Sequence, residues 1–167
     1  SKTGIEVMSV NLLLQDETEP VVWRGPVIAG TVKQFWQDVV WNDVDYMFVD
    51  MPPGTGDILI TLSQKVNFDG IVIISTPQDI ALIDAIKGVN MFKKIDIPIL
   101  GIIENMSYFI CPNCGNKSDI FGHKGARETA ENIGETFLGE IPLHMEIREN
   151  ADNGTPIIIT NPESPHT

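Results

Sequence analysis

The chain has 167 residues, a formal net charge of −12 at pH 7 and a sequence pI of about 4.4. A surface this acidic repels nucleic-acid backbones and anionic lipid head groups, so we expect neither nucleic acid nor a membrane as partner. No apolar run reaches the ~18 residues needed to span a bilayer, and Ser1–Val10 lacks a signal-peptide pattern. These features predict a globular cytoplasmic protein whose length suits one core-bearing domain.

Short apolar runs alternate with helical patterns along the chain. The runs predict strands over Tyr46–Asp50, Ile71–Ser75, Ile97–Ile103, Phe137–Ile141 and Ile157–Thr160. Apolar residues spaced by three and four predict helices over Gly30–Trp41, Asp79–Lys94 and Lys124–Ile133, with a short one over Ile58–Val66. Most of the strands are continuously apolar, which is typical of parallel sheets flanked by helices. The alternation predicts a doubly wound, mainly parallel α/β sheet that binds ligands beyond the carboxyl ends of its strands.

The first motif with a chemical meaning follows the first predicted strand. Residues 48–57 read Phe-Val-Asp-Met-Pro-Pro-Gly-Thr-Gly-Asp. The strand-end carboxylate of Asp50 suits a Walker B position, where it orients Mg²⁺ through the water shell of the ion. Gly54 would let a backbone N–H approach a γ-phosphate in a switch II loop. The alternative is an ordinary strand followed by a tight Pro-Gly turn.

The second motif is Cys111-Pro112-Asn113-Cys114, which holds the only two cysteines of the chain. Two thiolates can chelate one metal centre, but a closed zinc site or a [4Fe-4S] cluster needs four ligands. His123 has no suitable spacing, so the simplest solution is a two-fold homodimer in which each copy contributes both cysteines. A zinc knuckle, a redox pair and inert thiols are the alternatives. Pro112 and Gly115 favour a knuckle in a loop over the helix start that a redox pair needs.

Two further positions are candidates for nucleotide contact. Asn105 follows a buried apolar run, and its amide can pair with a purine edge, although an asparagine that caps a turn is the alternative. Pro142 ends the next predicted strand and is a candidate wall of a base pocket. Trp23 and Arg24 suit either a partner surface or an arginine lying over a core tryptophan. Arg148 and Asp152 are spaced for an ion pair within a helix.

The motifs together resemble those of a known family. Residues 50–57 resemble the switch II signature of the Mrp/ApbC group within the MinD-like P-loop ATPases. Six more segments match the same group in order, at residues 23–26, 75–79, 104–107, 111–114, 120–122 and 139–143. The resemblance covers about Gly4 to Ile158.

The resemblance implies a MinD-like P-loop NTPase fold and a function. It implies ATP and Mg²⁺ as cofactors of the complete protein, with Asn105 at the adenine. It also implies a [4Fe-4S] cluster that Cys111 and Cys114 bridge across a homodimer and that is delivered to apo iron–sulfur proteins. A eukaryotic member would then be placed in the mitochondrial matrix.

The sequence departs from the family pattern at one important point. It contains no G-x-x-x-x-G-K-[ST] loop, and the family's Walker A loop and switch I aspartate would precede this region. We therefore expect a partial P-loop NTPase domain over residues 1–167, inactive as an ATPase by itself, with a metal-binding loop near 107–123 and an extended tail over 161–167. A non-enzymatic zinc- or iron-binding dimeric scaffold is the alternative. The acidic charge disfavours a ParA/MinD-like positioning ATPase that acts on DNA or membrane.

Overall fold

The structure is a computed structural model that describes residues 3–16, 25–51, 59, 62–63 and 66–165. The chain divides into two compact units, Ser1–Asn67 and Phe68–Thr167. Trp23, Arg24, Gly54 and most of the predicted helix at Ile58–Val66 lie outside the described residues. In the part that is described, the longest helices are too short or too polar to cross a bilayer.

The first unit contains a short 3-10 helix, η1 (Val10–Leu13), and the helix α1 (Gly25–Gln37). Helix α1 begins and ends earlier than the predicted Gly30–Trp41. The earlier start is compatible with Pro26, because the first turn of a helix does not use the N–H that proline lacks. Near the C-terminal end of α1, the carbonyl of Phe35 accepts a hydrogen bond of 3.3 Å from Nε1 of Trp41.

The prediction of a strand over Tyr46–Asp50 is wrong for this structure. These residues form neither helix nor strand, and Asp50 is exposed. A strand needs a neighbour to complete its hydrogen-bond ladder, and no other strand occurs among the described residues of this unit. An apolar run alone cannot supply that neighbour.

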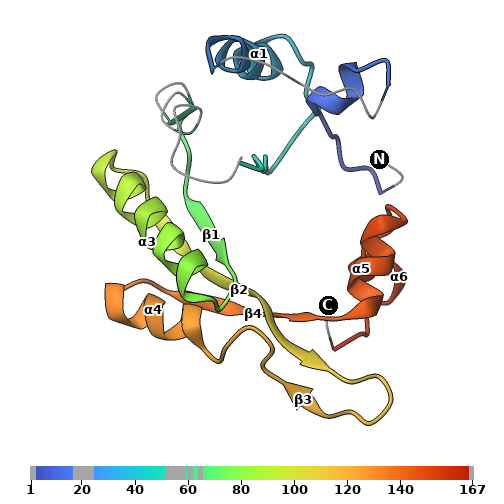
Figure 1. Cartoon of the computed structure of the whole chain (residues 1–167). Coiled ribbons are helices and arrows are strands. Elements are labelled where there is room, and N and C mark those ends of the chain that lie inside the picture. The colour runs from blue at the N-terminus through green and yellow to red at the C-terminus, as the bar shows by residue number, and fades with distance from the viewer. Residues whose placement is uncertain (1–2, 17–24, 52–58, 60–61, 64–65, 166–167) are drawn as a thin grey trace. The chain divides into compact units, whose positions relative to one another are not determined.

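The second unit is built on a four-stranded sheet with β2 (Ile99–Ile110) at its centre (Figure 1). β1 (Ile71–Ser75) and β4 (Phe137–Leu143) each pair with β2 in parallel. A short strand, β3 (Lys117–Ser118), pairs with the far end of β2 in the antiparallel direction. The mainly parallel sheet of the sequence prediction is therefore confirmed, but β2 runs seven residues past the predicted end at Ile103.

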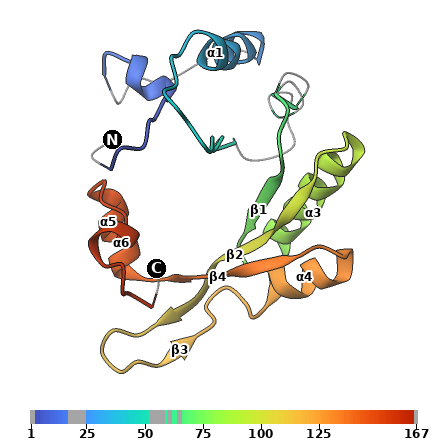
Figure 2. The same cartoon turned by 180° about the vertical axis from the view of Figure 1, so that it is seen from behind.

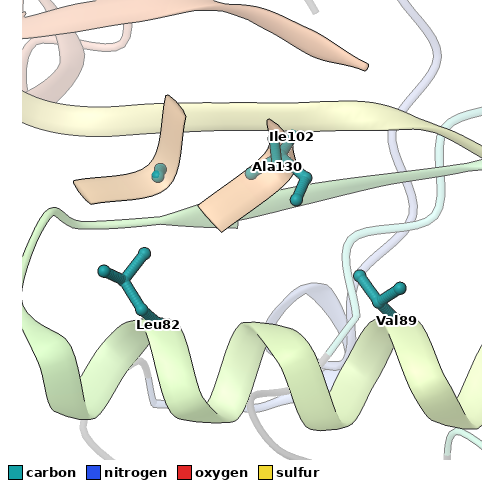
Figure 3. Close-up of a cluster of buried hydrophobic side chains, with 5 residues drawn as sticks. Leu82, Val89, Ile102 and Ala130 are labelled. Atoms are coloured by element: carbon teal, nitrogen blue, oxygen red, sulfur yellow. The ribbon is translucent and has the colours of Figure 1, made fainter. Parts of the chain in front are cut away.

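Two helices lie on the same side of this sheet, and the hydrophobic core of the unit lies between them and the sheet (Figure 2). They are α3 (Asp79–Lys94) and α4 (Gly125–Ile133), both close to the predicted bounds. In Figure 3, Leu82 and Val89 point from α3 toward Ile102 of β2 and Ala130 of α4. The helical period of three to four brings these apolar side chains to one face of α3, which is why the periodicity predicted the helix well. Asp79 in the first turn and two lysines in the last complement the helix dipole.

The end of the second unit differs from the prediction. Ile157–Thr160 forms a short helix, α6, which follows α5 (Met145–Asp152) and contacts it. The predicted strand is wrong because a short apolar run such as Ile157–Ile159 fits one turn of helix as well as a strand. Here Pro156 precedes the turn, and the N–H of Asn161 donates to the carbonyl of Ile157 at 2.8 Å. The predicted Arg148–Asp152 ion pair is present at 2.8 Å on α5.

Candidate functional site

The Cys-x-x-Cys segment is the turn of a β-hairpin. β2 ends at Ile110, Cys111 follows directly, and β3 begins at Lys117. The N–H of Cys111 donates to the carbonyl of Asn116 at 3.0 Å, and the N–H of Gly115 donates back to the carbonyl of Cys111 at 2.9 Å. Gly115 has φ +70°, a left-handed conformation that glycine adopts without strain. The predicted loop near 107–123 is therefore largely an ordered hairpin, with the two cysteines at its tip.

The two thiols differ in their surroundings. Both are free, Cys111 being half-buried and Cys114 exposed. Hydrogen bonds from the backbone N–H groups of Asn113 and Cys114, and then from the Cys114 side chain, hold the pKa of Cys111 below its usual range. Such N–H donors favour the thiolate, which is the form that binds metal. The backbone of the turn thus favours the thiolate form of Cys111.

Within the described ranges, no group of three or more histidine, cysteine, aspartate or glutamate side chains is arranged to hold a metal ion. The nearest histidine along the chain, His123, has its Nδ1 2.9 Å from Oδ2 of Asp119. The two cysteines therefore remain a two-ligand set in one copy of the described chain.

The pKa of Cys111 leads to a test on the metal-free chain. A lowered pKa leaves more thiolate at a given pH, so the alkylation rate of Cys111 should have a pH midpoint below that of free cysteine, about 8.5. The rate can be followed by iodoacetamide labelling and peptide mass spectrometry. In Cys114→Ser the two backbone donors remain, so most of the shift should persist. A midpoint at or above that of free cysteine would contradict the N–H···S arrangement.

A second group of predicted residues lies where the β1–β2 ladder ends. β1 ends at Ser75, as predicted, opposite Glu104 of β2. Asn105 is the next residue of β2 and pairs with Ile141 of β4, so it lies one register position from the buried Pro142. The sequence predicted Asn105 at the end of its strand, but β2 continues to Ile110. Asn105 instead lies one residue past the point where the neighbouring strand β1 ends.

The side chain of Asn105 is partly engaged by the backbone. Its Oδ1 accepts a hydrogen bond of 2.9 Å from the N–H of Met106, which has φ +53°. The contact lies within β2, at an irregularity of its ladder with β4, and not at the turn that was the alternative for this residue. The carboxamide NH₂, a donor group, is the part of Asn105 that suits an acceptor on a purine.

Glu104, to which the sequence pattern assigned no role, is the most buried acidic side chain among the described residues. Its Oε2 accepts a hydrogen bond of 2.7 Å from the N–H of Ala126, in the first turn of α4. Its Oε1 accepts a short hydrogen bond from the hydroxyl of Ser107, which is also buried. The carboxylate caps a helix that has no side-chain cap of its own at Lys124. An acidic residue inside an apolar strand was the signal that could have revealed it.

A close approach of loops completes this edge of the sheet. A Cβ atom on Gly125 would lie 2.5 Å from the carbonyl oxygen of Pro77, in the loop that follows β1. Only glycine allows the start of α4 to come this near to that loop. The ends of β1 and the start of α4 are therefore packed together around Glu104.

Comparisons with known proteins agree with these motifs. The ParA family model described as "NUBPL iron-transfer P-loop NTPase" matches residues 1–167. An iron-sulfur cluster carrier protein of Pseudomonas fragi is 53% identical over 162 residues, covering 97% of this chain and 56% of the relative. The iron-sulfur cluster transfer protein NUBPL of Dictyostelium discoideum is 48% identical over 162 residues, covering 97% of this chain and 50% of the relative. The chain thus spans about half the length of these relatives.

A solved structure supports the fold. A nucleotide-binding protein from Archaeoglobus fulgidus, in complex with ADP, superposes with a TM-score of 0.71 at 37% identity. The match covers 83% of this chain and 56% of that one. The mainly parallel sheet and the family match over residues 1–167 agree with the resemblance that the sequence motifs indicated. The chain belongs to the ParA-family NUBPL iron-transfer P-loop NTPases, the group that contains the iron–sulfur cluster carriers.

Proposed function

We propose that this chain carries a [4Fe-4S] cluster, shared between two copies, and transfers it to apo iron–sulfur proteins. The observation that carries the proposal is the pair of free thiols on the ordered tip of the β2–β3 hairpin, and the lowered pKa of Cys111 agrees with it. The cluster is the cargo of the protein. The reducing compartment that it requires would be the cytoplasm or, in a eukaryote, the mitochondrial matrix.

Ligand counting supports the shared site. A [4Fe-4S] cluster takes four thiolates, and each copy contributes Cys111 and Cys114. A two-fold axis between two hairpins supplies four equivalent ligands without any further residue. The exposure of Cys114 keeps the tip accessible to a second copy and, later, to a recipient.

A nucleotide-binding role belongs to the same proposal. Asn105 and Pro142, adjacent in register on β2 and β4, would contact the base. Asp50 would orient a Mg²⁺ ion through water, and Gly54 would approach a phosphate. The ADP complex of the Archaeoglobus fulgidus neighbour supports nucleotide binding as a role of this fold. Because the sequence holds no G-x-x-x-x-G-K-[ST] loop, we assign no phosphate cradle to this chain.

Anaerobic reconstitution tests the proposal. With iron and sulfide supplied, the chain should bind about four irons and four sulfides per two copies and should elute as a dimer. Iron and sulfide analysis combined with the mass in solution measures this. A monomer that holds four irons would contradict the shared site. Stoichiometric zinc with no affinity for a cluster would favour the zinc scaffold, since zinc also accepts four cysteines.

A further inference from the structure

A small pocket lies beside the cysteine turn. Its volume is about 220 Å³, and it is lined by Phe109, Ile110, Pro112, His144, Met145, Glu146 and Glu149. The first three come from the end of β2 and the turn, and the others come from the first five residues of α5 and the residue that caps it. One wall, Pro112, is the residue directly after Cys111, so anything in this pocket lies next to the cluster ligands.

The pocket combines apolar walls with acidic groups. Phe109, Ile110, Pro112 and Met145 provide the apolar surface, and the side chain of Met145 is 54% exposed. The carboxylates are those of Glu146 and Glu149 on α5. The one cation of that helix, Arg148, is already bound to Glu149 at 3.1 Å and to Asp152 at 2.8 Å. The residues around the pocket therefore carry a net negative charge, as does the chain as a whole.

The size of the pocket limits what can enter it. Pockets for small-molecule ligands and cofactors have volumes of about 300–1,000 Å³, and this one is smaller. A volume of this size suits a single large side chain, the kind of anchor that dominates protein–protein interfaces. The acidic groups favour an anchor that is flanked by lysine or arginine.

We propose that this pocket is the docking site for the cluster recipient, which inserts one large apolar side chain flanked by basic residues. The inference rests on the proposed carrier function, because the recipient must approach the cysteine turn. The shared cluster joins two copies through Cys111 and Cys114, but a second copy that also filled this pocket would bring the carboxylates of two identical surfaces together, whereas a basic recipient neutralises them. The pocket would hold the recipient beside the cluster while the ligands exchange.

A labelled peptide, Gly-Lys-Arg-Phe-Arg-Lys-Gly, tests the docking on the metal-free chain. Met145→Ala removes apolar wall without changing the charge, and it should weaken the binding roughly tenfold, as loss of an anchor contact does. The control Ile158→Ala makes a similar truncation at an exposed apolar residue of α6 that does not line the pocket, and it should leave the affinity unchanged. Equal affinities for the two variants, or no binding to the unmodified chain, would overturn the proposal.

A second pair of variants separates the pocket from general charge. Glu149 and Asp152 both contact Arg148 and are both exposed, but only Glu149 lines the pocket. Glu149→Lys should weaken peptide binding several-fold more than Asp152→Lys, although the charge change is the same. Equal losses would mean that only the net charge attracts the peptide, and the proposal would fail.

Transfer from the cluster-loaded chain connects the pocket to the function. The probe is an apo-ferredoxin of the [4Fe-4S] type, with and without the same peptide fused to one terminus. The fused form should receive the cluster faster, and Met145→Ala should remove most of that advantage while the iron content of the carrier stays the same. An advantage that survives undiminished in Met145→Ala would overturn the docking site. A loss of dimer mass in that variant, without loss of peptide binding, would instead assign the pocket to the contact between copies.

The two proposals can fail separately. Peptide binding is measured without a cluster, so its failure leaves the cluster-carrier assignment intact. A chain that binds the peptide but takes up no iron and sulfide would instead contradict the proposed function.

Discussion

Replacing either Cys111 or Cys114 by alanine is expected to abolish the bound cluster. Each substitution leaves two thiolates in a pair of chains, whereas the shared centre needs four. The fraction of dimer should fall as well, because metal ligation links the two copies and its free energy contributes to association. Iron and sulfide content after anaerobic reconstitution, together with the mass in solution, measures both effects.

The hairpin offers a matched control for these variants. Asn113→Ala changes a residue between the two cysteines but keeps both thiols and the backbone N–H directed at Cys111. This variant should retain a near-normal cluster content. If Cys114→Ala keeps its cluster, or if Asn113→Ala loses it as completely as the cysteine variants do, ligation by two cysteines from each copy is refuted.

Glu104→Ala is expected to lower the free energy of unfolding by about 3 kcal/mol. The substitution strands two buried hydrogen-bond donors, the N–H of Ala126 and the hydroxyl of Ser107, and an unsatisfied buried group costs about 1–3 kcal/mol. It also removes the cap at the N-terminus of α4 and leaves a small cavity. Urea denaturation of the purified chain, followed by circular dichroism, gives the value.

Two further variants separate the hydrogen bonds from other effects. Glu104→Gln keeps a carbonyl for Ala126 and an amide for Ser107, so its loss should be no more than about half as large. Glu140 is paired in register with Glu104 on the neighbouring strand, but its ion pair with Arg127, at 3.2 Å, is partly exposed. Glu140→Ala should therefore cost less than about 1 kcal/mol. A Glu104→Ala variant no less stable than Glu140→Ala would show that the buried carboxylate does not stabilise the fold.

Several elements could be predicted from the sequence because their causes are local. Helix α3 was predicted with its observed bounds, since its apolar spacing, acidic start and basic end lie within sixteen residues. β1 and the start of β4 were found because continuous apolar runs fit a covered parallel sheet. The family was also visible in the sequence, because its motifs are short segments in a set order.

Other features depend on strand-pairing partners that lie far away in the sequence and cannot be identified from a local pattern. The run Tyr46–Asp50 is not a strand among the described residues, and Ile157–Thr160 is a helix, because pairing partners decide between strand, coil and helix turn. β2 continues past Ile103 because β4 and then β3 extend its ladder to Ile110. This extension turns the cysteine loop into the tip of a hairpin.

The sequence by itself determined which residues are the proposed ligands: two cysteines, spaced for one metal centre, in a chain with no others. Only the tertiary structure decided how they are presented, with backbone N–H groups directed at Cys111 and a pocket against Pro112. The same holds for Glu104, whose partners Ser107 and Ala126 lie 3 and 22 residues away. The type of a side chain sets its chemistry, whereas hydrogen bonds and burial depend on groups that folding brings within reach.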